Sequence, residues 1–492
     1  MTYLRISLCL LACAALAACA VGPDYARPAA PISPTYKEAA GWSPAAPADA
    51  LDRGDWWSLF GDPVLDGLEA RVKVSNQNIA AAEAAYRQAR ATVSEQRAAL
   101  FPTINLTGSG SRSGDGGGGG TVIVNPDGST SGGVVGGRSS ARSTYRANLG
   151  GTWEPDVWGR IRRTVEGAEA NAQASEADLA NATLSAQGEL AVNYFGLRQA
   201  DANVAIDQAT VEGYRRTTQI TQNRFNAGTV PHSDLLQAQT QLANAQADLA
   251  SSRQQRATFE HAIAVLVGEA PGTFSLPPAT WTDYAPAIPP GVPSTLLQRR
   301  PDIAGAERRM AAANAQIGVA RAAYFPDLTL NGSYGFAANA LSGLFSAPNS
   351  LWSYGLSAAE TLFDGGARKA QVTGAKAAYD QTVAQYRQTV LTALQDVEDQ
   401  LAATRALEAQ YVLRRQAATA ADAAATMVEN QYRAGTVSYV EVFTAQTSAY
   451  AARTALAQAQ AQRQTTAVTL IQALGGGWHD PTFAANGAAA RP

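Results

Sequence analysis

The N-terminus carries the residues best placed for covalent chemistry. Residues 6–18 form a short apolar run that ends on Leu16-Ala17-Ala18-Cys19 and follows a single positive charge at Arg5. A run of this length is too short to span a bilayer and is typical of a secretory signal peptide. Its last four residues match the bacterial lipobox, in which cleavage precedes a cysteine that then receives acyl chains. We therefore predict a signal peptide over residues 1–18 and lipidation of Cys19; the alternative is an ordinary signal peptide with a chance cysteine.

No other constellation of residues predicts catalysis or a bound cofactor. Cys9 and Cys13 lie within the predicted signal peptide, so the mature chain keeps one cysteine and has no disulfide or cysteine metal site. No nucleophile has a base beside it, and the Gly-rich run at 116–120 lacks the Lys-Ser/Thr of a phosphate-binding loop. The dispersed histidines lack metal-ligand spacing: His232, His261 and His479. We expect a protein that is not an enzyme, with no metal and no cofactor beyond the covalent lipid on Cys19.

Composition argues against a compact enzyme and against nucleic-acid binding. Among 492 residues only 8% are aromatic and 16% charged, and alanine dominates long stretches, so large side chains for a core are few. The net charge of −3 is nearly neutral and no basic run is present, which argues against a nucleic-acid surface. After the signal peptide no segment has about eighteen continuous apolar residues, so a membrane crossing would require a closed β-barrel.

The two halves of the chain repeat each other. Four segments recur in the same order: 79–83 at 303–307, 98–102 at 322–326, 225–230 at 432–437 and 238–240 at 445–447. Four matches in one order indicate a duplication. The offset is 224 residues before the expected strands and 207 after them, so the first copy holds about 17 extra residues between its strands. The Gly-rich stretch at 108–137 has room for them and is predicted to be a flexible loop on the outer cell surface.

Each repeat is predicted to contain a helix, a β-hairpin and two long helices joined by a sharp turn. From 165 to about 226 there is no proline, and Ala, Gln, Glu, Leu and Arg predominate, which favours helix. A helix of about 65 residues would be about 100 Å long, which predicts a coiled-coil rod and not part of a globular domain. Residues 233–267, 369–433 and 440–474 have the same character.

Four further stretches alternate apolar with polar residues, as the strands of an outer-membrane protein do. The apolar positions are Ile104 and Leu106; Tyr145, Leu149 and Trp153; Leu328, Leu330, Tyr334 and Phe336; and Trp352, Tyr354, Leu356 and Ala358. We expect the apolar side chains to face lipid and the polar ones to face a water-filled lumen. Four strands cannot close a barrel, for which about eight is the minimum, whereas three subunits would supply about twelve. The strands therefore predict a trimer with a shared 12-stranded β-barrel.

With these elements in place, the chain resembles the TolC-like outer membrane factor family, in its lipoprotein branch associated with multidrug efflux. The motifs that carry the resemblance are residues 19–25 after the lipobox, Trp56-Trp57-Ser58-Leu59-Phe60-Gly61-Asp62-Pro63, Arg299-Arg300-Pro301-Asp302-Ile303, and the paired turns at Gly228 and Gly435. The resemblance implies an α plus transmembrane β fold: a homotrimer with a β-barrel in the outer membrane and a coiled-coil α-barrel in the periplasm. It also implies docking on a periplasmic adaptor (membrane fusion) protein and an inner-membrane RND-type transporter, which supplies the energy.

The turns between the long helices are candidates for contact with the adaptor. Gly228 and Gly435 suit the left-handed residue that ends a helix, so closing the hairpins is part of their role. Because Thr and Val follow each glycine, we predict that Gly228-Thr229-Val230 and Gly435-Thr436-Val437 also form adaptor-contact tips.

Two acidic residues follow the turns, one in each repeat. The resemblance implies that Asp234 and Glu441 ring a constricted periplasmic aperture and favour cations there. The alternative is capping of the helix N-termini, where acids are common. The sequence departs from the family pattern one helical turn on, where a second aspartate is replaced by Thr444, with Gln237 in the other repeat. Gating beyond the two acids is therefore left open.

The chain is predicted to begin with a signal peptide at 1–18 and a lipidated N-terminal segment and equatorial region at 19–63. The first repeat is 64–268, with a hairpin at about 102–153 and a tip at 226–234, and a Pro-rich linker follows at 269–293. The second repeat is 294–475, with a hairpin at about 326–362 and a tip at 433–441, and the tail is 476–492.

The predicted function is a lipid-anchored outer-membrane exit duct of a tripartite efflux pump, extending into the periplasm and passively conducting drugs or other small toxic compounds. The alternative is the outer-membrane duct of a type I protein secretion system, which the lipobox and residues 21–25 disfavour.

Overall fold

The computed structural model describes residues 20–30, 32–39, 55–114, 123–124, 130–131, 141–279, 281, 283–286, 288 and 299–476. The predicted signal peptide, Cys19, most of the Gly-rich stretch and nearly all of the predicted tail lie outside these residues. The chain divides into two compact units. The first contains Met1–Ala26, Arg90–Ala170 and Ala311–Asp380, and the second contains Arg27–Ala89, Asn171–Met310 and Gln381–Pro492. Each unit takes segments from both sequence repeats.

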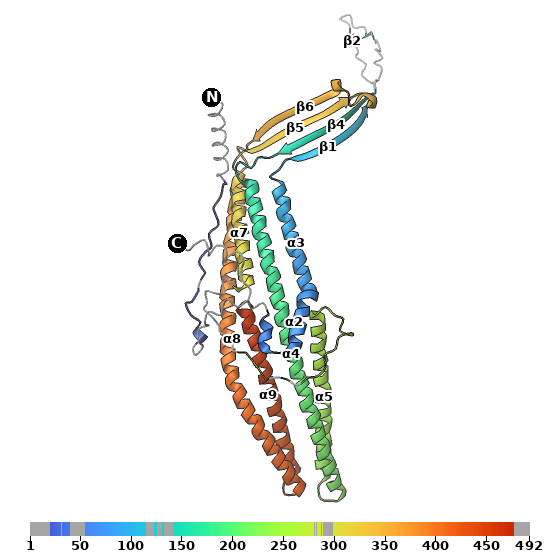
Figure 1. Ribbon diagram of the computed structural model, residues 1–492, viewed down its shortest axis with the longest axis vertical. Coiled ribbons are helices and arrows are strands. Elements are labelled where there is room, and N and C mark those ends of the chain that lie inside the picture. Colours follow the sequence, from blue (N-terminus) through green and yellow to red (C-terminus); the bar gives the residue numbers. More distant parts are fainter. Residues whose placement is uncertain are drawn as a thin grey trace. The chain divides into compact units, whose positions relative to one another are not determined.

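Long helices make up most of the described chain (Figure 1). They fall into pairs of nearly equal length: α3 (Gln77–Ala98) and α7 (Pro301–Ala322) with 22 residues each, α4 (Arg160–Asn226) and α8 (Ala367–Ala434) with 67 and 68, and α5 (His232–Leu266) and α9 (Tyr439–Ala473) with 35 each. These pairs confirm the predicted long helices and have the same order in both repeats. Among the described helices, none combines the length and apolar character that a membrane span needs.

Shorter elements complete the described chain. They are η1 (Lys37–Ala39), η3 (Trp56–Phe60), α2 (Pro63–Ser75), β2 (Ile123–Val124), β3 (Thr130–Ser131), η5 (Leu341–Gly343) and η6 (Ala347–Asn349).

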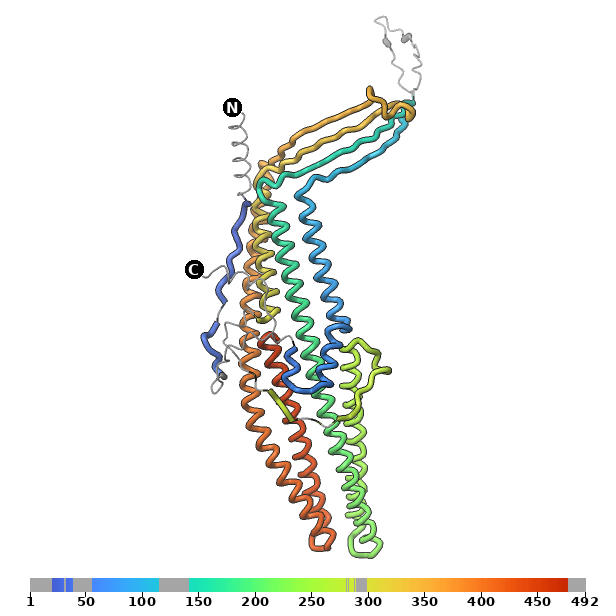
Figure 2. The backbone as a smooth tube through the Cα atoms, in the orientation of Figure 1, coloured from blue at the N-terminus to red at the C-terminus, as the bar shows by residue number. Residues whose placement is uncertain are grey.

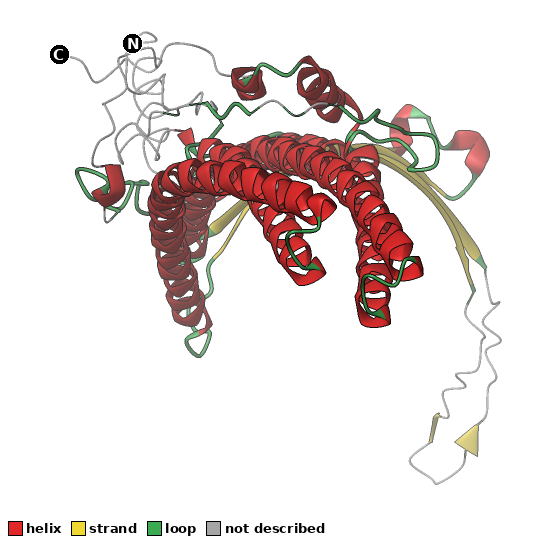
Figure 3. Ribbon diagram, turned by 90° about the horizontal axis from the view of Figure 1, so that it is seen from below, coloured by secondary structure: helices red, strands yellow, loops and turns green. Residues whose placement is uncertain are grey.

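The first unit holds one antiparallel sheet of four strands, whose curved course is visible in yellow in Figure 3. Its strands are β1 (Thr103–Ser113), β4 (Arg142–Trp153), β5 (Asp327–Ala338) and β6 (Ser350–Ala359), hydrogen-bonded in that order. Each of the four predicted strands is therefore confirmed. Since β4 pairs with β5, the two hairpins form one sheet whose edges are β1 and β6.

The two faces of this sheet differ in chemistry. One row of residues aligned across the strands is apolar: Leu106, Leu149, Tyr334 and Trp352. The next row is polar or small: Asn105, Gly150, Ser333 and Ser353. The apolar row is strongly exposed, with Leu106 80% and Trp352 69% accessible, so one face of the sheet is uncovered and apolar in the single chain.

An acidic residue follows the second strand of each hairpin and pairs with an arginine at the start of the next helix. Glu154 follows β4 and binds Arg160 at 2.6 Å, and Glu360 follows β6 and binds Arg368 at 3.1 Å. The two ion pairs place charge immediately beyond the apolar strands, where chain direction changes from sheet to helix.

The segment that follows Cys19 is held closely against the helices of the first unit. A Cβ on Gly22 would meet the Cα of Gly318 at 2.6 Å. The two backbones can approach this closely because both residues are glycines. Arg163 of α4 binds the carboxylate of Asp24 at 3.0 Å, and the Asn314 amide of α7 donates to the Pro23 carbonyl at 3.0 Å. The N-terminal segment is thereby attached to both α4 and α7.

In the second unit, the motif at residues 56–63 packs on α4. The Phe60 ring lies 4.9 Å from that of Phe195, between centroids, and Tyr194 donates its hydroxyl proton to Asp62 at 2.5 Å. The other carboxylate oxygen of Asp62 accepts the Val64 amide at 2.9 Å and caps α2. One aspartate therefore starts a helix and fixes it to its neighbour.

Where one helix was predicted before the first hairpin, the structure has two, α2 and α3, separated by Asn76. The buried Asn76 amide donates to the Leu266 carbonyl at 2.9 Å, and its side-chain oxygen accepts the Asn78 amide at 2.9 Å. The side chain thus caps α3 and satisfies a carbonyl at the end of α5, which accounts for the break.

Glu69 on α2 is fully buried, and among the described residues neither of its carboxylate oxygens has a hydrogen-bond partner. Burial, with a smaller effect of the Asp66 charge, raises the pKa of Glu69 to about 9. The unfolded carboxyl ionises near its ordinary pKa of 4.5, so unfolding releases a proton over the range between these values. With respect to Glu69 the fold is therefore most stable below about pH 4.5, and it loses stability as the pH rises to about 9.

We predict that Glu69→Gln removes this loss, because an amide cannot ionise. At pH 8 the variant should melt at least about 3 °C above the wild type, while at pH 4 the two should melt together. Differential scanning fluorimetry across pH 4–9 measures this, with Glu83→Gln on the exposed side of α3 as the control. Parallel melting curves for wild type and Glu69→Gln at every pH would contradict a buried neutral carboxyl.

Candidate functional site

The two turns that join the long helices lie next to each other in the second unit, as Figure 2 shows at the end of the green and red hairpins. Gly228 and Gly435 have φ values of +70° and +80°, which confirms the left-handed conformation expected of them. Thr229 and Thr436 each donate a side-chain hydroxyl at 3.0 Å to a carbonyl five residues earlier, in the last turn of the helix.

These hydroxyl bonds give the threonines a role inside the turn. The sequence argument for adaptor contact assumed that turn closure alone would not need Thr-Val after glycine. In the structure Thr229 and Thr436 each donate both amide and hydroxyl to one carbonyl, and Val437 packs against buried residues of the hairpins. The threonines and Val437 therefore make contacts within the turns, and contact between these turns and an adaptor stays a prediction.

The two candidate aperture acids occupy the first turn of α5 and α9. Glu441 accepts from the Ser438 amide at 3.3 Å and from its hydroxyl at 3.1 Å, in a capping box. Asp234 accepts from the Ser233 hydroxyl at 3.4 Å. Glu441 is exposed and Asp234 half-buried. Within one chain Glu441 therefore performs the capping that was the alternative interpretation, and the aperture role of both acids stays a prediction.

Direct bonds connect the two hairpins near their turns. The hydroxyls of Thr221 on α4 and Tyr432 on α8 lie 3.0 Å apart and are both buried. The Arg224 guanidinium lies 4.4 Å from the centroid of the Tyr432 ring and donates to the Tyr432 carbonyl at 2.5 Å. Arg224 and Thr221 thus hold the end of the second hairpin against the first.

A buried cluster extends this contact along the returning helices. Its core consists of Ala238, Tyr432, Tyr439 and Val442. Burial is the main reason that the pKa of the Tyr439 hydroxyl is raised, with smaller effects of Tyr214, Tyr432 and Asp234. The charge of Asp234 thus acts weakly on a tyrosine of the second hairpin.

The sequence analysis missed Thr221, Arg224 and Tyr432. The duplication could have pointed to them. At the offset of 207 residues Tyr432 corresponds to Phe225, and Thr221 and Arg224, which bind Tyr432, have no residues of the same type at the corresponding positions of the second copy. A tyrosine in the second copy where the first copy has phenylalanine indicates a hydroxyl that makes a specific hydrogen bond.

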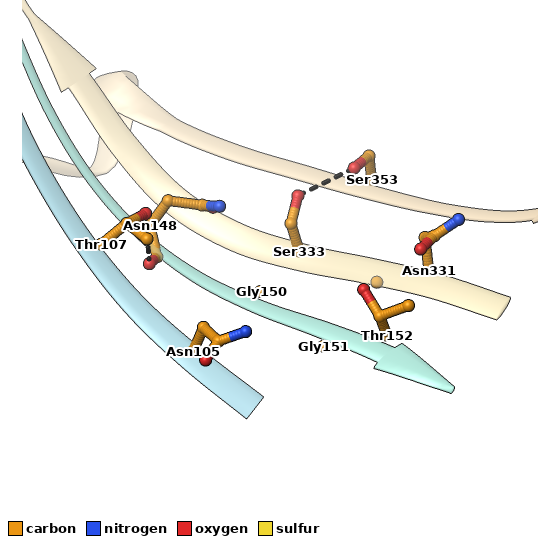
Figure 4. Close-up of a pocket in the computed structure, with 10 residues that line it drawn as sticks. Asn105, Thr107, Asn148, Gly150, Gly151, Thr152, Asn331, Ser333 and Ser353 are labelled. Atoms are coloured by element: carbon orange, nitrogen blue, oxygen red, sulfur yellow. Dashed lines mark hydrogen bonds between the residues drawn. The ribbon is translucent and has the colours of Figure 1, made fainter. Parts of the chain in front are cut away.

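The polar face of the sheet in the first unit forms a second candidate surface, shown in Figure 4. It is a shallow hollow lined by short polar side chains and glycines, among them Asn105, Thr107, Asn148, Thr152, Asn331, Ser333 and Ser353. Ser333 and Ser353 bond each other at 2.8 Å. None of the described residues that line the hollow is charged, so it suits water and offers little to select a solute. Among the described residues, no group of His, Cys, Asp or Glu could hold a metal ion.

Comparison with known proteins identifies the family of this chain. Residues 70–269 and 292–476 match the family model described as outer membrane efflux protein. The chain belongs to the outer membrane efflux protein family. The chain is 31% identical to the probable efflux pump outer membrane protein TtgC of Pseudomonas putida over 475 residues, 96% of this chain and 95% of the relative. It is 30% identical to the outer membrane protein OprJ of Pseudomonas aeruginosa, with 96% of this chain and 95% of OprJ covered.

Solved structures give the same answer for this efflux protein. The outer-membrane channel OprN superposes with a TM-score of 0.83 at 31% identity, covering 94% of this chain and 100% of that one. The open state of the Neisseria gonorrhoeae MtrE outer membrane channel gives 0.79 at 28% identity, covering 94% and 100%. The predicted TolC-like channel fold is thereby confirmed, as are the function of an outer-membrane exit duct for efflux and the prediction that the chain is not an enzyme.

We predict that Tyr432→Phe loosens the contact between the hairpins, because it removes the buried hydrogen bond between the Tyr432 and Thr221 hydroxyls, worth about 0.5–1.5 kcal/mol, while Thr221 keeps its bond to the Thr217 carbonyl. Hydrogen–deuterium exchange should become faster in the last turns of α4 and α8 and stay unchanged in the sheet. Tyr354→Phe, on a strand and 83% exposed, is the control. Unchanged exchange at the turns in Tyr432→Phe would show that the aromatic and arginine contacts suffice.

Proposed function

We propose that the efflux protein works as a homotrimer, in which each subunit gives four strands to a shared 12-stranded β-barrel and its long helices to a periplasmic α-barrel. The duct passively conducts drugs or other small toxic compounds to the exterior. An inner-membrane RND-type transporter supplies them and the energy, and a periplasmic adaptor protein connects the two.

One observation carries this proposal: the four-stranded sheet has an exposed apolar face and two free edges. In hydrocarbon each unpaired backbone group costs several kcal/mol, so an open sheet of four strands cannot face lipid alone. Copies of the same sheet joined edge to edge remove every free edge and enclose the polar face in Figure 4.

The names of the relatives support efflux and a broad range of cargo. TtgC is named as an efflux pump component, whereas a relative from Escherichia coli, 28% identical, is named the cation efflux system protein CusC. Since relatives of this chain are named for toluene efflux and for cation efflux, we propose that cargo is selected upstream. The polar hollow without charges in this chain supports the same division of roles.

We also propose that Cys19 carries the lipid that anchors the mature chain. Ala20 packs closely on Gly159, just ahead of α4 and six residues after the end of β4, and the next residue donates its amide to the Trp158 carbonyl at 3.1 Å. The described residues that follow Cys19 are therefore held near the junction of strands and helices, which supports a lipid that enters the membrane at this level.

At the other end of the long helices, we propose that Asp234 and Glu441 of three subunits surround the periplasmic aperture. The turns Gly228-Thr229-Val230 and Gly435-Thr436-Val437 then face the adaptor. The exposure of Gly228, Thr229, Gly435 and Thr436 supports this surface, and the exposure of Glu441 leaves its second carboxylate oxygen available to the pore.

Mass spectrometry tests the assembly and the anchor together. In detergent, native mass should correspond to three copies. After denaturation each chain should lack residues 1–18 and carry acyl chains on Cys19. A monomer in mild detergent would contradict the shared barrel, and an unmodified Cys19 would contradict the anchor without affecting the trimer.

Conductance tests the aperture. We expect Asp234→Asn with Glu441→Gln to lower cation selectivity in planar bilayers, because a trimer would lose six charges around a narrow opening. Glutamine supports a capping box, so the loss of charge is separated from the loss of the cap. Asp380→Asn, on the exposed surface of α8 in the first unit, is the matched control. Unchanged selectivity in the double variant would leave capping as the role of these acids.

A further inference from the structure

Charge is distributed unevenly over the four strands of the sheet. The strands contain three arginines, Arg112 on β1 and Arg142 and Arg146 on β4, and one acid, Asp327 on β5. The arginines lie in the part of the sheet farthest from the helices, because β1 ends at Ser113 and β4 begins at Arg142. Asp327 begins β5 and follows a helix closely. The two ends of the sheet therefore differ in the sign of their charge.

The alternation of side chains divides the arginines between the two faces of the sheet. Arg142 and Arg146 are an even number of residues from Asn148, which lines the polar hollow in Figure 4, so all three share the polar face. Arg112 is an even number of residues from Leu106 on β1 and lies on the apolar face. Two of the three arginines therefore extend the polar hollow toward the end of the sheet.

Small neighbours leave the side chain of Arg146 uncovered. Ser109 of β1 and Ala337 of β5 lie opposite it on the two adjacent strands, and Arg146 is exposed. Arg142 is exposed as well, and its Nε donates to the Asn339 side chain at 3.3 Å. Among the described residues, no acid forms an ion pair with either arginine. Both guanidinium groups thus keep their charge uncompensated on this face.

The one acid on the polar face of the strands is too distant to compensate for this charge. Asp327 is ten residues along β5 from Ala337, the residue opposite Arg146, which corresponds to about 34 Å at about 3.4 Å per residue. Salt at about 0.1 M screens charges in water beyond about 10 Å. The turn at 339–349 has no charged residue, and the connection at 114–141 contains two aspartates and one further arginine. Positive charge therefore exceeds negative charge at this end.

The duplication shows that these arginines belong to one hairpin alone. β4 corresponds to β6 at the offset of 207 residues, since Leu149 corresponds to Leu356. At the same offset Arg142 and Arg146 correspond to neutral residues of the second copy, Asn349 and Ser353. The sheet itself therefore forms without a positive charge at these positions.

On the basis of the proposed trimer, we propose that Arg142 and Arg146 form a ring of guanidinium groups, two from each of three subunits, that binds polyvalent oxyanions inside the outer end of the duct. In the proposed barrel the polar face is enclosed, and the end of the sheet farthest from the helices is the end at which solutes leave. A guanidinium group donates two parallel hydrogen bonds to a phosphate or carboxylate group. An enclosed lumen with walls of low dielectric constant concentrates the field of such groups.

The spacing of the arginines favours a ligand with several negative charges. Arg142 and Arg146 are four residues apart on one strand, which corresponds to about 14 Å. A monovalent anion would meet one exposed guanidinium group and would gain little in water. A polyvalent phosphate can contact groups from more than one residue or subunit, so its affinity should depend on the ring as a whole.

Block of the ionic current tests the ring in the full-length protein. The protein is added to one chamber of a planar bilayer, so that its long helices remain there and the outer end of the duct faces the opposite chamber. We expect inositol hexakisphosphate in the opposite chamber to reduce the conductance of the wild type. The half-blocking concentration should rise at least about tenfold in Arg142→Gln with Arg146→Gln, because the anion loses its charge-assisted hydrogen bonds.

Arg112→Gln is the matched control, because it removes the same charge from the same end of the sheet on the opposite face. It should leave the half-blocking concentration at the wild-type value. If the double variant fails to assemble, Arg146→Gln alone replaces it and should raise the half-blocking concentration at least about threefold, since it leaves the bond between Arg142 and Asn339 in place.

The outcomes separate the ring from the duct. A wild-type channel that inositol hexakisphosphate does not block would overturn the ring and leave the proposed duct intact. Equal block of the wild type and the arginine variants, or an equal loss of block in Arg112→Gln, would have the same meaning. A wild-type chain that is monomeric by native mass and forms no channel would overturn the duct, and with it the ring.

Discussion

The rest of this molecule depends on one constraint: the backbone N–H and C=O groups at the edges of the sheet need hydrogen-bond partners. A chain that faces hydrocarbon with four strands must find partners for two edges, and no element in the described part of the chain covers β1 or β6. The same incompleteness continues into the helices. Ile79 is the one buried residue of the 22 in α3, so this helix makes few contacts inside its own chain. The single subunit therefore leaves its strand edges and helix sides uncovered, and in the proposed trimer identical neighbours would cover them while the apolar face of the sheet meets lipid.

The two copies share the geometry of their helical hairpins, and the residues that differ between them make the specific contacts that join the hairpins. Both hairpins end in a left-handed glycine followed by a threonine that caps the preceding helix. The bond that joins the hairpins, however, involves the Tyr432 hydroxyl, and the first copy has Phe225 there. Arg224 is likewise matched by Gln431 in the second copy. An approximate twofold repeat thus becomes an asymmetric pair of hairpins through a few polar substitutions.

Sequence periodicity was sufficient to predict the helices and strands, but it could not predict where one element ends and the next begins. Alternation over Ile104 and Leu106, or over Trp352 and Tyr354, predicts strands because successive side chains of an extended chain point to opposite faces. Long runs without proline predict α4 and α8, since proline would break the backbone ladder of a helix. The break at Asn76 could not be predicted in this way, since its cause is the Leu266 carbonyl 190 residues away. The buried, unpaired carboxyl of Glu69 has the same character, because nothing in the pattern of α2 distinguishes it from an exposed glutamate.

The closely packed N-terminal segment has a consequence for the order in which the molecule is made. Gly22, Pro23 and Asp24 leave the ribosome early, yet the amide that binds the Pro23 carbonyl belongs to Asn314, 291 residues later in the chain. The docking site consists of α4 and α7, so it is complete only after more than half of the polypeptide has been synthesised and exported. The first residues of the mature protein are therefore among the last to reach their final place. During the interval the lipid proposed on Cys19 would hold the unfinished chain at a membrane surface until the helices can receive residues 22–24.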